Sequence, residues 1–210
     1  MSDLVFYTNP MSRGQIVRWM LEEVGAPYEQ RLLDYETTMK APEYLAINPM
    51  GKVPAIVHTG KVVTECAAIC AYLADAFPDT GLAPPLAERA DYYRWLFFAA
   101  GPVEAAFGNK GAGLEASLDK QRMLGYGSFE QTVDALEYAV KGKSYIAGDR
   151  FSAADVYVGS MISFMLNFKM LESRPAFASY IGALHERPAW KRAREIDDAL
   201  IAKATASADA

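Results

Sequence analysis

The most informative segment of this 210-residue chain reads Asn48-Pro49-Met50-Gly51-Lys52-Val53-Pro54-Ala55. Proline has no backbone N–H, so Pro54 fits the first position of a strand rather than its middle. If the Val53–Pro54 peptide bond is cis, the turn presents the N–H and C=O of Val53 to a ligand. A bound peptide could then pair with Val53 as an added strand does. The alternative is a tight turn without a ligand.

Strand and helix patterns surround this segment in the first third of the chain. Short apolar runs bounded by Gly, Pro or Asn indicate strands, and apolar residues three and four apart indicate helices. The expected elements are, in order, a strand over 4–7, a helix over 16–24, a strand over 28–33, a helical turn over 42–46, strands over 53–57 and 62–64, and a helix that ends before Pro78. The order βαβ then ββα predicts one α/β domain over residues 1–77.

The rest of the chain is expected to be helical. Residues 78–86 contain three prolines and a glycine and predict a linker. Helical spacing then dominates residues 87–204, and the small, polar residues 205–210 predict a frayed tail. Ser152 followed by Asp155 has the form of a capping box at the start of a strongly apolar helix, which is a folding device rather than a site.

Two further clusters in the α/β domain carry chemistry. Ser12 follows the first strand, where a helix start favours negative charge and a hydroxyl can donate to an anion. It could equally serve only as a helix cap. Glu65 follows the last strand and could receive an ammonium group, while the N–H groups of residues 65 and 66 could receive a carboxylate. An α-amino acid would satisfy both, although an ordinary helix with an acidic first turn would look the same.

In this order and spacing, the clusters resemble the glutathione transferase superfamily, of the cytosolic, bacterial-like type with a serine active site. The matching features are Ser12 after the first strand, the segment Asn48-Pro49-x-Gly-Lys-Val-Pro54, Glu65 followed by a small residue, and the Phe151-Ser152-x-x-Asp155 cap of the helical half. The resemblance implies an α/β plus all-α protein: a thioredoxin-like N-terminal domain, then an all-helical domain that contains an electrophile pocket.

The resemblance also implies the roles of individual residues. Ser12 would stabilise the thiolate of glutathione, with Tyr7 as the alternative hydroxyl. Val53 would pair with the cysteinyl unit, Glu65 and Cys66 would hold the γ-glutamyl end, and two lysines would face the glycyl carboxylate. The expected glutathione-binding residues are Lys40, Lys52, Val53, Pro54, Glu65 and Cys66. The expected electrophile-pocket residues are Met11, Phe98, Phe107 and Phe164.

The main functional hypothesis is a glutathione S-transferase that conjugates glutathione to a hydrophobic electrophile, since a serine at position 12 cannot form a mixed disulfide. Two alternatives remain: a glutathione-dependent isomerase or dehalogenase, and a non-catalytic binding protein on the same fold. A third alternative, an unrelated α/β domain with a helical appendage, would be supported by a trans, solvent-facing Val53–Pro54 bond. Cys66 replaces the Ser or Thr usual in the family and predicts weaker glutathione binding, because a thiol is a weak donor.

Composition argues against other classes of protein. The net charge is −5 with Lys and Arg dispersed along the chain, so we expect no nucleic-acid partner. No apolar stretch reaches the ~18 residues of a membrane span, and no signal peptide is evident. Cys66 and Cys70 cannot build a disulfide scaffold or a metal site, which predicts a cytoplasmic protein without a metal. The resemblance and the apolar faces over 68–76 and 92–107 favour a homodimer, with a role in detoxification.

Overall fold

The computed structural model describes residues 3–114 and 116–208. They divide into two compact units, of which unit 1 contains the residues up to Thr80 together with those from Arg187 onward, and unit 2 contains Gly81–Glu186. The expected helical domain over 87–204 therefore ends too late. The last helix of the chain belongs with unit 1, because one of its faces packs on a helix of that unit.

Unit 1 is built on a four-stranded sheet. Its strands are β1 (Leu4–Thr8), β2 (Glu29–Leu32), β3 (Ala55–His58) and β4 (Lys61–Thr64), in the order β2-β1-β3-β4. β1 pairs in parallel with β2 and antiparallel with β3, and β3 pairs antiparallel with β4. The helix α1 (Gly14–Val24) forms the crossover that a parallel pair needs. A tight turn at Thr59 and Gly60, both with positive φ, closes the expected hairpin.

Helices cover both faces of this sheet. Phe6 in β1 points toward α1, because the guanidinium of Arg18 lies 5.3 Å from the centre of its ring. The next residue, Tyr7, points the other way, and its ring lies 5.6 Å from that of Tyr44 in α2 (Pro42–Leu45), which follows the turn η1 (Thr38–Lys40). The helix α3 (Cys66–Ala76) packs against α1 and β3. The alternation along β1 thus fits a sheet buried on two sides.

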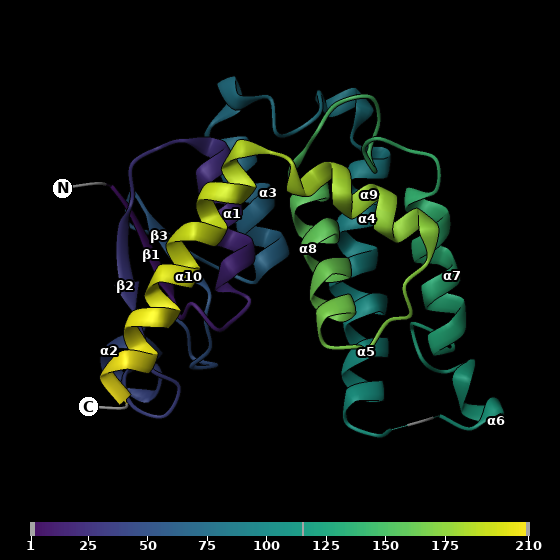
Figure 1. The fold of residues 1–210 in the computed structure, drawn as a ribbon, viewed down its shortest axis with the longest axis horizontal. Coiled ribbons are helices and arrows are strands. Elements are labelled where there is room, and N and C mark those ends of the chain that lie inside the picture. The colour runs from purple at the N-terminus through teal and green to yellow at the C-terminus, as the bar shows by residue number, and fades with distance from the viewer. Residues whose placement is uncertain (1–2, 115, 209–210) are drawn as a thin grey trace. The chain divides into compact units, whose positions relative to one another are not determined.

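The helix α10 (Pro188–Ala208) completes unit 1 and lies along α1 (Figure 1). It continues through most of the segment 205–210 that the sequence predicts to be frayed, because alanines favour helix and Thr205 Oγ1 donates to the carbonyl of Ile201 at 3.0 Å. The last two residues of that predicted tail lie outside the described part of the chain.

A buried ion pair joins α1 to α10. Arg18 Nε lies 2.7 Å from Asp197 Oδ1, and the two side chains are 1% and 2% exposed. Arg18 also donates to Tyr28 Oη at 2.9 Å and to the side chain of Gln30. Further hydrogen bonds help such a pair to tolerate burial, and here each of the three guanidinium nitrogens donates one. The pair therefore fixes the register of α10 on α1.

Unit 2 is helical. Its helices are α4 (Ala90–Phe98), α5 (Glu104–Gly111), α6 (Leu118–Gln121), α7 (Phe129–Val140), α8 (Ala153–Asn167) and α9 (Pro175–His185). A π-helical turn over Ala99–Val103 separates α4 from α5, and Pro102 within it supplies no N–H. The helical stretch that carries the apolar face over 92–107 is therefore interrupted. The short turns η2 (Pro78–Thr80) and η3 (Leu86–Glu88) occupy the expected linker.

The capping box predicted at the start of α8 is confirmed, and its Asp155 also accepts hydrogen bonds from residues outside the box. Asp155 Oδ2 accepts from the N–H and the hydroxyl of Ser152, both at 2.9 Å. Its Oδ1 accepts from the N–H of Ile146 at 2.8 Å and from Tyr180 Oη at 2.7 Å. Burial raises the pKa of Asp155, and these hydrogen bonds oppose the rise. The carboxylate therefore joins α8, α9 and the preceding loop at one buried point.

Candidate active site

The strand register brings the three predicted clusters to one end of the sheet of unit 1. Tyr7 near the end of β1 pairs with Ala55 at the start of β3, which in turn pairs with Thr64 at the end of β4. The loop before α1, the loop before β3 and the start of α3 therefore lie beside one another. These are the three connections in which the sequence places its polar clusters.

Ser12 lies in the loop between β1 and α1 and is 8% exposed. Its Oγ donates to the carbonyl of Asn9 at 2.6 Å and accepts from the N–H of Gly14 at 2.9 Å. Gly14 is the first residue of α1, so the hydroxyl does satisfy one N-terminal donor of that helix. Its single proton is directed at Asn9. To serve an anion, Ser12 must turn that proton away from the carbonyl.

The packing around Ser12 depends on Gly14, to which the sequence analysis gave no role. A Cβ at this position would overlap Thr8 Oγ1 and lie 3.0 Å from Ser12 Oγ. The start of α1 can approach the end of β1 this closely only because glycine has no side chain. A glycine at the first turn of a helix that follows a strand is the signal that could have identified it.

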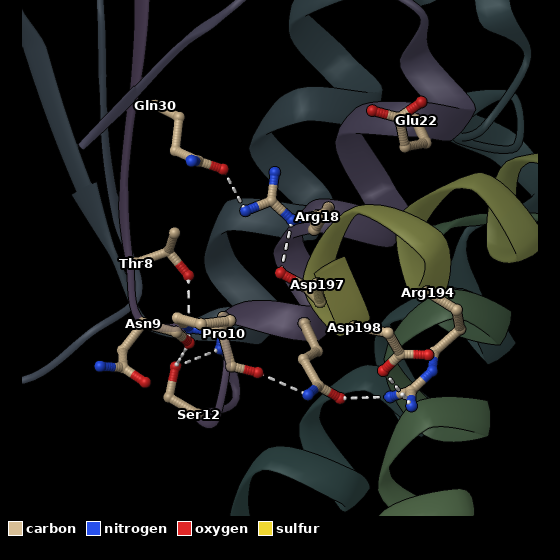
Figure 2. A network of polar contacts seen from close by, with 12 residues as sticks. Thr8, Asn9, Pro10, Ser12, Arg18, Glu22, Gln30, Arg194, Asp197 and Asp198 are labelled. Carbon is tan, nitrogen blue, oxygen red and sulfur yellow. Dashed lines mark hydrogen bonds and ion pairs between the residues drawn. The ribbon is translucent and has the colours of Figure 1, made fainter. Parts of the chain in front are cut away.

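Asn9 holds the Ser12 loop in shape. Its side chain accepts from the N–H of Met11 at 2.9 Å and donates to the carbonyl of Leu33 at 2.9 Å, while its own carbonyl receives the Ser12 hydroxyl. Figure 2 shows the Ser12 hydroxyl at the main-chain carbonyl of Asn9, with the Asn9 side chain pointing away from it. The side chain of Asn9 therefore ties this loop to the segment that follows β2.

A second connection runs from the same loop to α10. Gln15 Nε2 donates to the carbonyl of Pro10 at 2.6 Å, and Arg194 in α10 donates to Gln15 Oε1 at 2.9 Å (Figure 2). Arg194 is itself held by Asp198 at 2.8 Å. Sequence reasoning missed these residues, because Gln15 and Arg194 stand 179 positions apart and neither belongs to a motif.

The backbone of Val53 lies beyond the strand ladder, whose first paired residue in β3 is Ala55. The preceding carbonyl, of Lys52, accepts from Tyr44 Oη at 2.6 Å and from Asn48 Nδ2 at 2.7 Å. Two side chains thus fix the peptide unit just before Val53. This leaves an ordered backbone segment at the sheet end, in the position that strand-like pairing with a peptide requires.

The other features of this loop concern Pro54 and the two lysines. The Val53–Pro54 bond is cis and Pro54 is buried, so the trans, solvent-facing bond that would have supported an unrelated domain is not observed. Lys40 Nζ donates to the carbonyl of Gly51 at 2.7 Å, which uses one of its three N–H donors. The side chain of Lys52 is exposed.

Glu65 and Cys66 form the start of α3. Glu65 is the N-cap residue with φ 68° and ψ 120°, a costly conformation for a residue with a side chain, and it is exposed. Cys66 Sγ donates to the carbonyl of Arg13 at 3.7 Å, so the starts of α1 and α3 are in contact. Burial raises the pKa of Cys70 well above its usual value, which makes that thiol inert.

The remaining candidates occupy different surroundings. Tyr7, the alternative hydroxyl, is half-buried and packs against Tyr44 on the face of the sheet that carries α2. Met11 is 61% exposed in the Ser12 loop. The three phenylalanines of the expected electrophile pocket belong to unit 2.

Within unit 2 these three aromatic side chains differ in exposure. Phe107 is 4% exposed and its ring lies 4.7 Å from that of Phe129, so it is a core residue of this unit. Phe98 and Phe164 are partly buried, and Phe164 packs on Phe168 at 4.5 Å between ring centres. Only the latter two therefore offer surface to a ligand of this unit.

Within residues 3–114 and 116–208, no set of three or more His, Cys, Asp or Glu side chains is grouped so that it could bind a metal ion. In the same part of the chain, no helix has both the length and the apolar character that crossing a membrane demands.

The four-stranded sheet with its helices, followed by a helical region, defines a thioredoxin-like protein with an all-helical extension. The family model described as glutathione S-transferase, N-terminal domain, matches residues 2–75. Glutathione S-transferase GST-4.5 of Xanthomonas campestris pv. campestris is 31% identical over 152 residues, which cover 68% of this chain and 71% of that protein. The chain belongs to the glutathione S-transferase family.

Solved structures agree with this assignment. The crystal structure of a glutathione transferase from Methylococcus capsulatus superposes with a TM-score of 0.77 and 28% identity, covering 93% of this chain and 98% of that one. A sphingomonad glutathione S-transferase complexed with glutathione gives a TM-score of 0.72 and 27% identity, covering 92% and 98%. The fold and the family are thus supported over nearly the whole chain.

Proposed function

We propose that this chain is a glutathione S-transferase that conjugates the thiolate of glutathione to a hydrophobic electrophile. The observation that carries the proposal is the buried hydroxyl of Ser12 at the start of α1, at the sheet end where the backbone of Val53 and the start of α3 also lie. The related sphingomonad enzyme is complexed with glutathione, which supports the same ligand here.

The hydroxyl of Ser12 and the start of α1 can together lower the pKa of a bound thiol by more than one unit. A free thiol has a pKa of ~8.5, and lowering it by two units requires ~2.7 kcal/mol. A hydrogen bond to a charged acceptor contributes ~1.5–3 kcal/mol, and a helix N-terminus ~0.3–1 kcal/mol. Turning the Ser12 proton away from Asn9 costs ~0.5–1.5 kcal/mol. At the middle of each range about 1.9 kcal/mol remains, which corresponds to a shift of about 1.4 pKa units.

The other residues would hold the tripeptide. The backbone of Val53, just before Pro54, pairs with the cysteinyl unit, and the carboxylate of Glu65 receives the γ-glutamyl ammonium group. The N–H groups at the start of α3, including that of Cys66, receive the adjacent carboxylate. The expected partners of the glycyl carboxylate are Lys40 and Lys52.

In the reaction, the thiolate attacks the electrophilic atom and forms a carbon–sulfur bond. In a substitution the leaving group departs with its bonding electron pair, and in an addition that pair passes onto the acceptor and is then protonated. The thiol gives up its proton to solvent before the attack, and the hydrogen bond from Ser12 stabilises the resulting thiolate. The proposed residues beside the electrophile are Met11, Phe98, Phe107 and Phe164, with Phe107 the weakest candidate because it is buried.

A titration of the thiol of bound glutathione tests the role of Ser12. We expect the bound thiol to titrate one to two units below free glutathione in the wild type, and close to the free value in Ser12→Ala. Tyr7→Phe serves as the matched control and should retain the low value. An unchanged thiol pKa in Ser12→Ala removes Ser12 from the mechanism and makes Tyr7 the residue to test.

A panel of electrophiles tests the reaction type. Aryl halides and activated alkenes report conjugation, whereas haloacids and cis-trans isomers report dehalogenation and isomerisation. Turnover only with the second group would replace our proposal by the isomerase or dehalogenase. Tight glutathione binding without any turnover, and without an effect of Ser12→Ala, would favour a binding protein instead.

We further infer a cytoplasmic homodimer that acts in detoxification. Tyr93 and Phe97 stand one turn apart on α4 and are 42% and 71% exposed, which suits a partner surface. Cys66 and Cys70 are not joined in a disulfide, which suits a reducing compartment. Light scattering tests the assembly: Phe97→Asp should reduce the mass of the particle by half, and an unchanged mass would exclude α4 from the interface.

A further inference from the structure

Tyr35 follows β2, and its hydroxyl reaches the Ser12 loop. Tyr35 Oη donates to the carbonyl of Met11 at 3.3 Å, and the side chain is 46% exposed. Burial raises the pKa of Tyr35, and the nearby side chain of Ser12 opposes the rise without cancelling it. The phenol is therefore protonated at neutral pH and has Ser12 as a neighbour.

The segment that carries Tyr35 is fixed relative to the Ser12 loop. The N–H of Leu33 donates to the carbonyl of Thr8 at 2.9 Å, and Asn9 Nδ2 donates to the carbonyl of Leu33 at 2.9 Å. On the other side of Tyr35, the N–H of Asp34 donates to Thr38 Oγ1 at 2.7 Å. The backbone that carries Tyr35 is thus ordered beside the Ser12 loop.

The hydroxyls of Ser12 and Tyr35 donate hydrogen bonds of different strength. Ser12 directs its proton at the carbonyl of Asn9 over 2.6 Å, which is a short bond. Tyr35 directs its own at Met11 over 3.3 Å, well beyond the usual ~2.7–2.8 Å for two oxygens. The Tyr35 proton is therefore the one that can change partner at low cost.

Ser12 Oγ also has room for a second donor. A hydroxyl oxygen has two lone pairs, and one of them accepts from the N–H of Gly14. A hydroxyl that accepts hydrogen bonds becomes a better donor, because the bonds along a chain polarise one another. A phenol that donates to Ser12 Oγ would strengthen the bond that Ser12 makes to an anion.

Building on the proposed function, we propose that Tyr35 is a positioning residue for the sulfur site. Its O–H turns from Met11 to Ser12 Oγ when the Ser12 O–H turns from Asn9 to the thiolate of bound glutathione. Tyr35 then holds Ser12 in the donating orientation and completes a chain of two hydroxyls that ends on sulfur. The residue acts through Ser12 and makes no bond to sulfur itself.

The test is a double-mutant cycle read by the thiol pKa of bound glutathione. Tyr35→Phe keeps the ring and should raise that pKa by about 0.5 units, a roughly threefold change in the ionisation constant. It should lower kcat at neutral pH and leave KM for glutathione within about twofold, since the tripeptide contacts remain. In a Ser12→Ala background, the same change should have no further effect, because the residue through which it acts is gone.

Tyr138→Phe is the matched control, since Tyr138 is 69% exposed on α7 in unit 2. The proposal is overturned if Tyr35→Phe leaves the thiol pKa at the wild-type value. It is also overturned if the shift persists in the Ser12→Ala background, which would place Tyr35 on the sulfur or in a general structural role. A wild-type protein that does not lower the thiol pKa at all would overturn the proposed function first, before any variant is measured.

Discussion

Arg194 in α10 donates a hydrogen bond to Gln15 Oε1 in α1 at 2.9 Å, and Gln15 Nε2 donates to the carbonyl of Pro10 at 2.6 Å. Arg194, in the last helix, therefore supports the Ser12 loop through two successive hydrogen bonds. This arrangement makes the C-terminal helix part of the support of the candidate active site, although it contributes no residue to the predicted clusters.

Gln15→Leu should weaken the sulfur site. The substitution preserves helix propensity but removes the bonds to Pro10 and Arg194, so the Ser12 loop loses one of its fixed points. We expect a loss of ~1–2 kcal/mol in the free energy of unfolding and a higher thiol pKa of bound glutathione. Arg192→Gln is the control, because its pair with Glu22 at 3.2 Å is surface-exposed and worth under ~1 kcal/mol. Equal thiol pKa values in both variants would contradict the role of Gln15.

Gly14→Ala should damage the site far more than a helical Gly→Ala change normally does. The new Cβ would overlap Thr8 Oγ1 and press on Ser12 Oγ, so the loop must move. We expect a loss of ~1–3 kcal/mol in unfolding free energy and of most conjugating activity. Gly108→Ala in α5 has open space around its Cβ and should instead stabilise by ~0.5–1 kcal/mol. Chemical unfolding of both variants, run side by side, decides between steric overlap and a general effect of alanine.

Removing one partner of the buried ion pair between Arg18 and Asp197 should strongly lower the free energy of unfolding. Asp197→Leu alone leaves a buried guanidinium without its carboxylate, which typically costs ~3–5 kcal/mol. The double variant Arg18→Met, Asp197→Leu should recover much of that loss, because two apolar side chains can replace a buried pair. Urea unfolding gives both values. A double variant as unstable as the single one would show that the bonds of Arg18 to Tyr28 and Gln30 matter more than the charge pair.

Asp155→Ala should destabilise unit 2 through unpaired donors. The change leaves the N–H groups of Ser152 and Ile146 and the hydroxyl of Tyr180 buried without an acceptor. We expect a loss of ~3–5 kcal/mol, at the upper end for single substitutions. Tyr180→Phe removes only one of these bonds and should cost ~1–2 kcal/mol. Comparable losses from the two variants would mean that the carboxylate contributes little beyond its bond to Tyr180.

Tyr44 should make stability fall at alkaline pH. Burial raises its pKa from 10.0 to about 12, with a hydrogen bond to Asn48 opposing the rise and Tyr7 adding to it. A group whose pKa is raised by folding stabilises below its unfolded pKa, and this contribution is lost as pH rises through the folded value. Between pH 10 and pH 12, wild type should therefore lose up to ~2.7 kcal/mol more than Tyr44→Phe. The free energy of unfolding of both proteins is measured at pH 9, 10 and 11. If it falls equally with pH in wild type and Tyr44→Phe, the raised pKa of Tyr44 is refuted.

Much of unit 1 could be predicted from the sequence, because its elements are short and each is bounded by Gly, Pro or Asn. The expected strand over 53–57 begins two residues later, at Ala55, since Pro54 has no N–H for the ladder. The three polar clusters fall at strand ends, and the observed register brings them together.

Other parts of the site could not be predicted, for two physical reasons. An apolar stripe shows that a helix buries one face but not which partner it meets, so the placement of α10 on α1 rather than with unit 2 is a tertiary result. Gln15 and Tyr35 act through single hydrogen bonds to backbone or hydroxyl groups, which leave no periodic pattern in the sequence.

The discontinuity of unit 1 bears on how the chain is made. A ribosome releases the sheet and α1 first, then all of unit 2, and only afterwards α10 with Asp197 and Arg194. During that interval the nascent sheet domain has Arg18 without its carboxylate and one side of α1 open to water, and exposed surface of this kind is what chaperones generally bind. Translation arrested before residue 187 should therefore yield chaperone-bound chains, and release of the final helix should free them.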